Sequence, residues 1–205
     1  GHGFCGMSRK RLLEILWDRA QELGCIIVWQ NELQDLPPAD LVVVCDGVNS
    51  LIRSRYHTEF QPEIEMRQCR FIWLGTSLRL PAFTFIFKET PYGLFQVHAY
   101  PYAEDRSTFI VECQDEVWKK AGLDTMSEEQ TLGWFEELFA EHLQGHPLMA
   151  NGSPWRRFPG IRCGRWHMQN AVLLGDAAHT AHFSIGSGTK LAMEDSITLV
   201  DALHS

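Results

Sequence analysis

The stretch Ala171-Val172-Leu173-Leu174-Gly175-Asp176-Ala177-Ala178-His179 decides the fold. Its four leading apolar residues do not alternate with polar ones, which is typical of a strand covered on both faces. A turn of small residues around one acid follows, and Gly186 and Gly188 then precede a helical run. Backbone N–H groups at the start of such a helix face an anion or a carbonyl group. Because ligands bind at the carboxyl ends of strands in open α/β sheets, we expect a ligand site at this turn.

Size and composition exclude several classes of protein. The 205 residues are 45% hydrophobic, which is enough for one or two domains with a packed core. The net charge of −8 argues against nucleic-acid binding. No apolar run approaches the roughly 20 residues of a membrane span, and we expect no signal peptide. Six widely spaced cysteines without a Cys-x-x-Cys motif predict thiols in a reducing, cytoplasmic setting.

The first part of the chain has the pattern of a covered α/β sheet. Ser8 is a candidate N-cap for a helix over residues 9–23, and Gly24 is its expected stop. Residues 25–29 form a short apolar run that predicts a strand. Residues 41–45 predict a second strand, fully buried, which ends in the Asp46-Gly47 turn.

The pattern changes after about residue 53 to an antiparallel sheet with helices. Four expected strands cover residues 71–76, 83–88, 94–100 and 107–113. The alternating aromatics Phe83, Phe85 and Phe87 are expected to pack in a core. A capping box at 127–130 then opens a helix, and the chain returns to the buried strand at Ala171. The order is therefore an α/β piece, an antiparallel insert and a second α/β piece.

Two motifs resemble those of the FAD-dependent aromatic hydroxylases, which are flavoprotein monooxygenases. Residues 39–53 carry Asp46, Gly47, Ser50 and Arg53 where the family's aspartate-glycine motif has them. Residues 175–179, followed by Gly186-x-Gly188, are similar to its second FAD motif. Residues 1–6, 95–101 and 180–190 further resemble the aryl-CoA branch of salicylyl-CoA 5-hydroxylase and 2-aminobenzoyl-CoA monooxygenase.

The resemblance implies a fold, a reaction and its partners. The fold class is α/β: a partial, Rossmann-like FAD-binding domain interrupted by an antiparallel β-sheet substrate domain with helices. The implied boundaries are 1–53 and 161–205 for the two FAD-binding parts and 54–160 for the substrate domain. The reaction is hydroxylation of an aromatic acyl-CoA with FAD, NAD(P)H and O2. A free aromatic or indolic acid is the alternative substrate.

The resemblance also implies roles for cofactor residues. Asp176 would accept hydrogen bonds from the ribityl hydroxyls of FAD, although a turn acid that caps a helix is the structural alternative. Gly186, Gly188, Thr189 and Lys190 would place a helix N-terminus near the flavin ring. Asp46 would contact FAD or the nicotinamide cofactor, or else serve only as a turn residue. Arg9 would lie near the flavin, or else be a solvated cation.

Substrate contacts are implied for two further segments. Phe183 and Ser184 are expected near the flavin ring and the substrate. Gln96 and His98 share one face of the insert sheet and could line an aromatic cavity, with solvent exposure or packing as the alternative. His179 and His182 have metal-ligand spacing, but no third ligand accompanies them, so we expect no metal site.

Some features depart from the family pattern. Phe183 and Lys190 stand where the wider family has Pro and Asn. No Gly-x-Gly-x-x-Gly occurs, although that motif would hold the ADP part of FAD. We therefore expect that an upstream part of the FAD domain is missing and that these 205 residues alone bind FAD weakly or not at all. A flavin-free, inactive fragment is the rival hypothesis.

Overall fold

The computed structural model describes residues 7–150, 152–182 and 188–205. These residues divide into two compact units. The first unit comprises residues 7–27 and 68–157, and the second comprises residues 28–67 and 158–205. The domain boundaries expected near residues 53 and 160 stay predictions.

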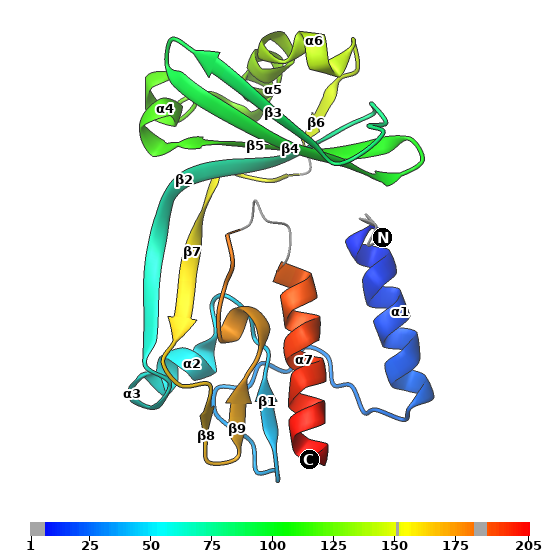
Figure 1. Cartoon of the computed structure of the whole chain (residues 1–205), viewed down its shortest axis with the longest axis vertical. Coiled ribbons are helices and arrows are strands. Elements are labelled where there is room, and N and C mark those ends of the chain that lie inside the picture. The colour runs from blue at the N-terminus through cyan, green and yellow to red at the C-terminus, as the bar shows by residue number, and fades with distance from the viewer. Residues whose placement is uncertain (1–6, 151, 183–187) are drawn as a thin grey trace. The chain divides into compact units, whose positions relative to one another are not determined.

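The second unit contains a small sheet of the order β1-β9-β8 (Figure 1). Its strands are β1 (Val42–Val44), β8 (His167–Met168) and β9 (Ala171–Leu173). Strands β1 and β9 are parallel, and β8 is antiparallel to β9. The helices of this unit are α2 (Leu51–Arg55), α3 (His57–Phe60), the 3-10 turn η1 (Gly175–Ala177) and α7 (Gly188–His204).

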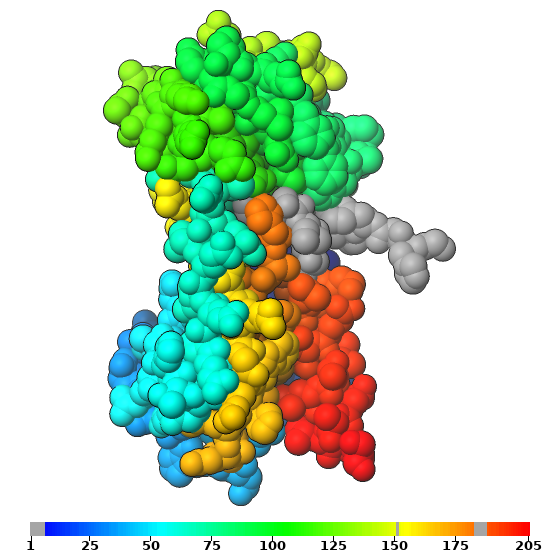
Figure 2. Space-filling model, turned by 60° about the vertical axis from the view of Figure 1, so that its left-hand side comes forward, coloured from blue at the N-terminus to red at the C-terminus, as the bar shows by residue number. Residues whose placement is uncertain are grey.

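The core of the second unit lies between this sheet and its connections. Its buried residues are Val44, Ile52, Phe60, Ile161, Cys163, Leu173, Ala177 and Ala178. Figure 2 shows α7 in red against the gold segment that contains β9 and η1, in agreement with the contacts between α7 and η1. The expected buried strand at Ala171 is thus confirmed: Ala171 and Leu173 are buried.

Strand β1 differs from the expectation of a fully buried strand. Only Val44 is buried, whereas Val43 is 41% exposed. The reason is that Val43 projects from the opposite face of the strand to Val42 and Val44, and this face is not covered at Val43. A groove of about 570 Å³ runs along β1 and residues 31–37. Residues 25–29 form no strand, and Trp29 is 69% exposed.

The first unit is built on an antiparallel sheet of the order β3-β4-β5-β2-β6, whose strand β2 begins in the second unit. Its strands are β2 (Pro62–Thr76), β3 (Thr84–Thr90), β4 (Gly93–Ala103), β5 (Arg106–Gln114) and β6 (Leu148–Ala150). Strand β7 (Arg156–Cys163) also pairs with β2. The four expected strands are confirmed, and each is longer than expected; the one expected over 83–88 lies at 84–90.

Helices α4 (Asp115–Lys120), α5 (Glu128–Leu138) and α6 (Ala140–Leu143) cover one face of this sheet (Figure 1). The expected capping box at Ser127 and Gln130 opens α5. The core beneath the helices contains Ile72, Leu74, Ile86, Phe95, Val97, Ala99, Phe109, Val111, Phe135 and Phe139. The Phe83, Phe85 and Phe87 stripe was expected in the core, but Phe85 and Phe87 are 54% and 62% exposed. Alternation placed Ile86 in the core and its neighbours on the other face.

Helix α1 (Arg9–Glu22) begins where expected, because the Ser8 hydroxyl accepts a hydrogen bond from Arg11 N at 3.2 Å. It buries none of its residues. The five described cysteines are free thiols. In the described ranges, none of the helices combines the length and apolarity that crossing a membrane requires.

Candidate functional site

The parallel pairing of β1 with β9 brings the two motif turns to one edge of the sheet. Val44 lies opposite Leu173, and Leu174 N donates to Val44 O at 3.0 Å. Because both strands run in the same direction, the turns that follow them leave the sheet together. The turn at Asp46 and the turn at Asp176 therefore form one site within the second unit.

The turn at Asp176 is tight and exposes only its acid. Gly175 has φ +58°, a backbone conformation that favours glycine. The N–H groups of Ala178 and His179 both donate to Gly175 O, at 2.9 and 3.0 Å. Ala177 and Ala178 are buried, whereas Asp176 is exposed. No hydrogen bond or ion pair joins the Asp176 carboxylate to any other described residue, so it is available to a ligand.

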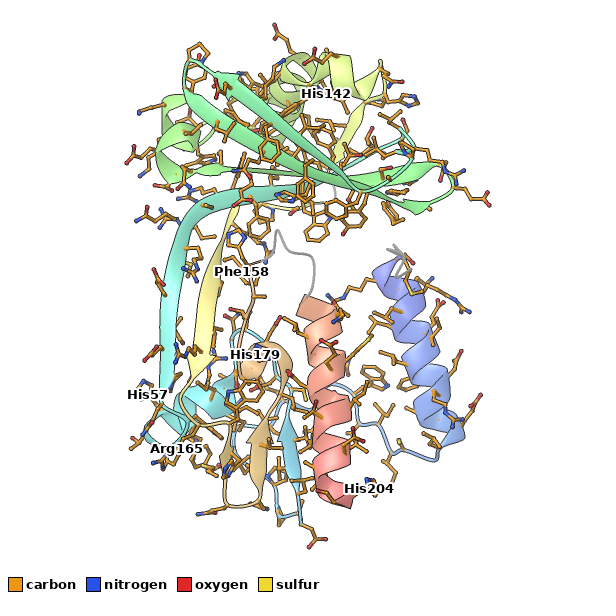
Figure 3. All side chains as sticks on the ribbon, in the orientation of Figure 1. His57, His142, Phe158, Arg165, His179 and His204 are labelled. Carbon is orange, nitrogen blue, oxygen red and sulfur yellow. The ribbon has the colours of Figure 1, made fainter. Side chains whose placement is uncertain are left out.

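Asp195 on α7 fastens this turn. Its Oδ2 accepts a hydrogen bond from Gly175 N at 3.0 Å and lies 2.9 Å from His179 Nε2. The His179 ring stacks on Trp166, with a centroid distance of 4.7 Å (Figure 3 labels His179). Asp195 was not identified from the sequence. The available signal was an acid two turns into the predicted helix after Gly188, on the side that packs against the Asp176 turn.

Arg53 ties the two turns together. Its side chain is almost fully buried, and its guanidinium donates to backbone carbonyls of both turns. Nη2 donates to Val48 O at 2.6 Å, and Nη1 donates to Ala177 O at 2.9 Å, with longer contacts to the carbonyls of Gly47 and Asp176. A planar fork of donors suits this role better than an ammonium group would. These hydrogen bonds give Arg53 of the aspartate-glycine motif a structural role.

Asp46 has a structural task at its own turn. Its Oδ2 accepts hydrogen bonds from Leu51 N at 2.9 Å and Ile52 N at 3.3 Å, at the start of α2. A carboxylate at that position satisfies N–H groups that have no partner inside the helix. Asp46 is also exposed, so a contact with FAD or a nicotinamide stays a prediction.

The N-terminus of α7 reaches the Asp176 turn. A narrow hollow is lined by Gly175, Asp176, His179, Ala181, Gly188, Leu191 and Ala192. A Cβ built on Gly188 would meet no atom within 4 Å, so a ligand could approach the backbone there. Thr189 and Lys190 are exposed in the first turn of α7, and Lys190 pairs with Glu194 on the same helix. Gly186, Phe183 and Ser184 lie outside the described residues.

These residues fit an FAD cofactor. Asp176 offers an unengaged carboxylate for the hydroxyl groups of a ribityl chain. The start of α7 offers backbone N–H groups and the positive end of a helix dipole. The fit concerns the ribityl and flavin end of the cofactor. Arg9, the other predicted cofactor residue, lies in the first unit at the start of α1 with an exposed side chain, and its role stays a prediction.

The predicted substrate residues Gln96 and His98 lie on β4 of the first unit, on the sheet face without helices. His98 is buried, and Gln96 is half-buried. The exposed Phe85 ring packs edge-on against the His98 ring, with centroids 5.0 Å apart. Aromatic rings beside His98 suit contact with an aromatic ligand. The substrate role of Gln96 and His98 stays a prediction.

Comparison with known proteins gives a consistent result. The model of the FAD binding domain family matches residues 37–205. The chain is 44% identical to a salicyloyl-CoA 5-hydroxylase from a Streptomyces species, over 99% of this chain and 41% of that protein. It is 40% identical to a 3-hydroxy-4-methyl-anthranilyl-[aryl-carrier protein] 5-monooxygenase from Streptosporangium sibiricum, over 96% of this chain and 52% of that protein.

Solved structures show the same fold. The structure of a 2-methyl-3-hydroxypyridine-5-carboxylic acid oxygenase superposes with a TM-score of 0.78 at 18% identity, over 97% of this chain and 58% of that one. The chain spans about half the length of the curated relatives that it matches, between 41% and 52% for the two named above.

Proposed function

The chain belongs to the FAD binding domain family, and from this premise we propose that it is part of a monooxygenase that hydroxylates an aromatic thioester. The observation that carries the proposal is the paired turn site, in which Asp176 is exposed and has no partner among the described residues, beside the N-terminus of α7. FAD bound there would supply the redox chemistry, with NAD(P)H as reductant and O2 as the oxygen source. The aryl thioester is preferred over a free acid because two similar relatives are named for CoA-linked or carrier-linked substrates.

The roles of the protein's own residues are binding and orientation. Asp176 accepts hydrogen bonds from hydroxyl groups of the cofactor. Gly188 and the first turn of α7 direct N–H groups toward its ring. Arg53 and Asp195 hold the two turns in place so that these groups need not reorganise when the ligand binds.

The cofactor site is tested by titrating FAD into the protein and following flavin fluorescence. We expect Asp176→Ala to weaken FAD binding by about tenfold, as for loss of one charge-assisted hydrogen bond worth about 1.5 kcal/mol. Asp201→Ala is the matched control, because Asp201 is an exposed acid on α7 away from the turn. Equal affinities of the two variants would remove Asp176 from the site. If the 205 residues alone bind no FAD, the same two substitutions are compared in the whole monooxygenase of the proposal, purified with its flavin.

The substrate class is tested with the flavin-loaded protein. We expect salicylyl-CoA or 2-aminobenzoyl-CoA to stimulate NAD(P)H oxidation and to yield a hydroxylated thioester, while salicylate and 2-aminobenzoate do neither. Stimulation by the free acids alone would favour the alternative, a hydroxylase of free aromatic or indolic acids. No stimulation by either class would refute the proposed function.

A further inference from the structure

Three cations of the first unit converge on one carboxylate, at the point where β5 leads into α4 (Figure 1). Asp115 Oδ1 lies 2.5 Å from Arg70 Nε and 2.6 Å from Arg157 Nη2. Asp115 Oδ2 lies 2.9 Å from Lys119 Nζ. The cations come from β2, β7 and α4, so only the fold brings them together. These four residues form the Asp115 cluster.

The Asp115 cluster carries more positive charge than its acid neutralises. Within the described part of the chain, Asp115 is the only acid that forms an ion pair with any of the three cations. Three positive charges and one negative charge leave a net charge of +2, and Glu116 and Lys120 on the same helix cancel each other. Because like charges held together repel, pairing with Asp115 does not explain why three cations gather here.

The cations are arranged so that an anion from solvent can reach them. The side chains of Lys119 and Arg157 are 60% and 37% exposed, whereas that of Arg70 is 21% exposed. Arg70 Cζ lies 3.8 Å from the centroid of the Trp118 ring, and this stacking orients the guanidinium plane. Arginine presents parallel N–H groups that match two oxygens of a phosphate. The cluster is therefore a preorganised site for an anion.

Hydrogen-bond donors also exceed acceptors beside the cluster. The Trp118 ring meets the Trp155 ring edge-on, with centroids 6.1 Å apart. Both indole nitrogens are buried, and neither has an acceptor among the described residues. A buried donor without an acceptor costs free energy. An ionised phosphate only accepts hydrogen bonds from such donors and cations, so it complements these surroundings.

We propose that the Asp115 cluster binds a phosphate group of coenzyme A when the substrate is an aryl-CoA thioester. This inference rests on the proposed function, and it narrows the thioester to a CoA-linked one. The chain has a net charge of −8, which repels a ligand that carries several negative charges of its own. A local excess of arginine and lysine offsets this repulsion where the phosphate binds.

The cluster lies near a predicted substrate residue of the same unit. Arg70 pairs with Cys113, which in turn pairs with Phe95, the neighbour of Gln96. Arg70 and Gln96 are thus two strand spacings apart, roughly 10 Å, and project from opposite faces of the sheet. Strand β4 begins and β5 ends within two residues of this row. The long pantetheine arm of an acyl-CoA can pass around this end of the sheet and join the two places.

The test compares thioesters with and without the phosphates, using the flavin-loaded monooxygenase. Salicylyl-pantetheine lacks the nucleotide of salicylyl-CoA and all of its phosphates. For wild type we expect its KM to be at least about tenfold higher at similar kcat, because the phosphates contribute binding that is equal in ground and transition states. Arg157→Gln should raise the KM for salicylyl-CoA about tenfold, as for loss of one charge-assisted hydrogen bond, and leave the KM for salicylyl-pantetheine unchanged.

Lys119→Gln is a second variant, because its side chain is the most exposed of the three cations. It should raise the KM for salicylyl-CoA by a smaller factor, and both effects should shrink at high salt. Arg106→Gln is the matched control. Arg106 begins β5 at the other end of the strand, is 53% exposed and lies 3.8 Å from the acid Asp105. It should behave as wild type with both thioesters.

Two further ligands examine the phosphate itself. Adenosine 3′,5′-bisphosphate should bind to wild type in a calorimetric titration, and Arg157→Gln should weaken this binding about tenfold. No binding to wild type would refute the anion site. Salicylyl-dephospho-CoA lacks only the 3′-phosphate. A KM close to that of salicylyl-pantetheine assigns the 3′-phosphate to the cluster, and a KM close to that of salicylyl-CoA assigns the diphosphate.

The two proposals fail in different ways. If wild type hydroxylates neither salicylyl-CoA nor salicylyl-pantetheine, the proposed function is refuted. If wild type hydroxylates both with the same KM, the function stands and the anion site is refuted. Equal increases in the two KM values in Arg157→Gln and Lys119→Gln would likewise refute the anion site and leave the cluster a structural role only.

Discussion

Replacing Arg53 by methionine should loosen the join between the two motif turns. The change removes the two shortest hydrogen bonds of the guanidinium, 2.6 Å to Val48 O and 2.9 Å to Ala177 O. Hydrogen bonds to a charged group contribute about 1.5–3 kcal/mol each, so the loss is about 3–6 kcal/mol. Removing a buried cation recovers part of its desolvation cost, and a net loss of about 3 kcal/mol in the free energy of unfolding is expected.

The measurement is urea unfolding, combined with hydrogen exchange of the Ala178 and His179 amides, which donate to Gly175 O. A loss of about 3 kcal/mol corresponds to a midpoint shift of about 1 M urea. Arg55→Met is the matched control on the same helix. Its guanidinium is half exposed and pairs with Asp35 at 2.8 Å, so its loss should cost at most about 1 kcal/mol. Equal effects of the two substitutions would refute the role assigned to Arg53.

Three further changes test other contacts. Asp195→Ala leaves the buried Gly175 N–H without its acceptor and should cost about 1–3 kcal/mol in urea unfolding, more than Asp195→Asn, which keeps an oxygen there. Hydrogen bonds from three cations hold the pKa of Asp115 well below its usual range, so its contribution to stability is present above the unfolded pKa of about 4 and declines as pH falls below that value. Asp115→Asn should therefore reduce the decline in the free energy of unfolding below about pH 4, and an unchanged decline would contradict this role. Burial raises the pKa of Cys113 to about 12, so a thiol reagent at pH 8 should modify the exposed Cys25 and reach Cys113 only after urea unfolding.

Much of the fold followed from local patterns in the sequence. Apolar runs without alternation located β9, alternation located β3 to β5, and Ser8 and Ser127 marked two helix starts. These features depend on neighbours in the chain, which is why sequence alone sufficed. The paired turns could also be expected, because parallel strands end at one edge.

The features that the sequence did not predict correctly depend on contacts between residues distant in the chain. The apolar run of β1 predicted burial on both faces, but Val43 is 41% exposed because the face from which it projects is not covered there. Alternation showed that Phe85 and Ile86 face opposite sides of the sheet, yet not which side the helices cover. The hydrogen bond between Arg53 and Ala177 joins residues 124 positions apart, and no local pattern encodes it.

Three acids at the paired turns, Asp46, Asp176 and Asp195, differ in their hydrogen-bond partners. Asp46 accepts two N–H groups of α2, and Asp195 accepts Gly175 N and contacts His179. Both carboxylates have internal partners, so their removal should appear mainly in stability. Asp176 has none in the described residues and stands exposed on a turn that other residues hold rigid. An acid fixed in position but left without a partner is what a ligand with hydroxyl groups requires, so Asp176→Ala should reduce FAD binding while leaving the free energy of unfolding nearly unchanged.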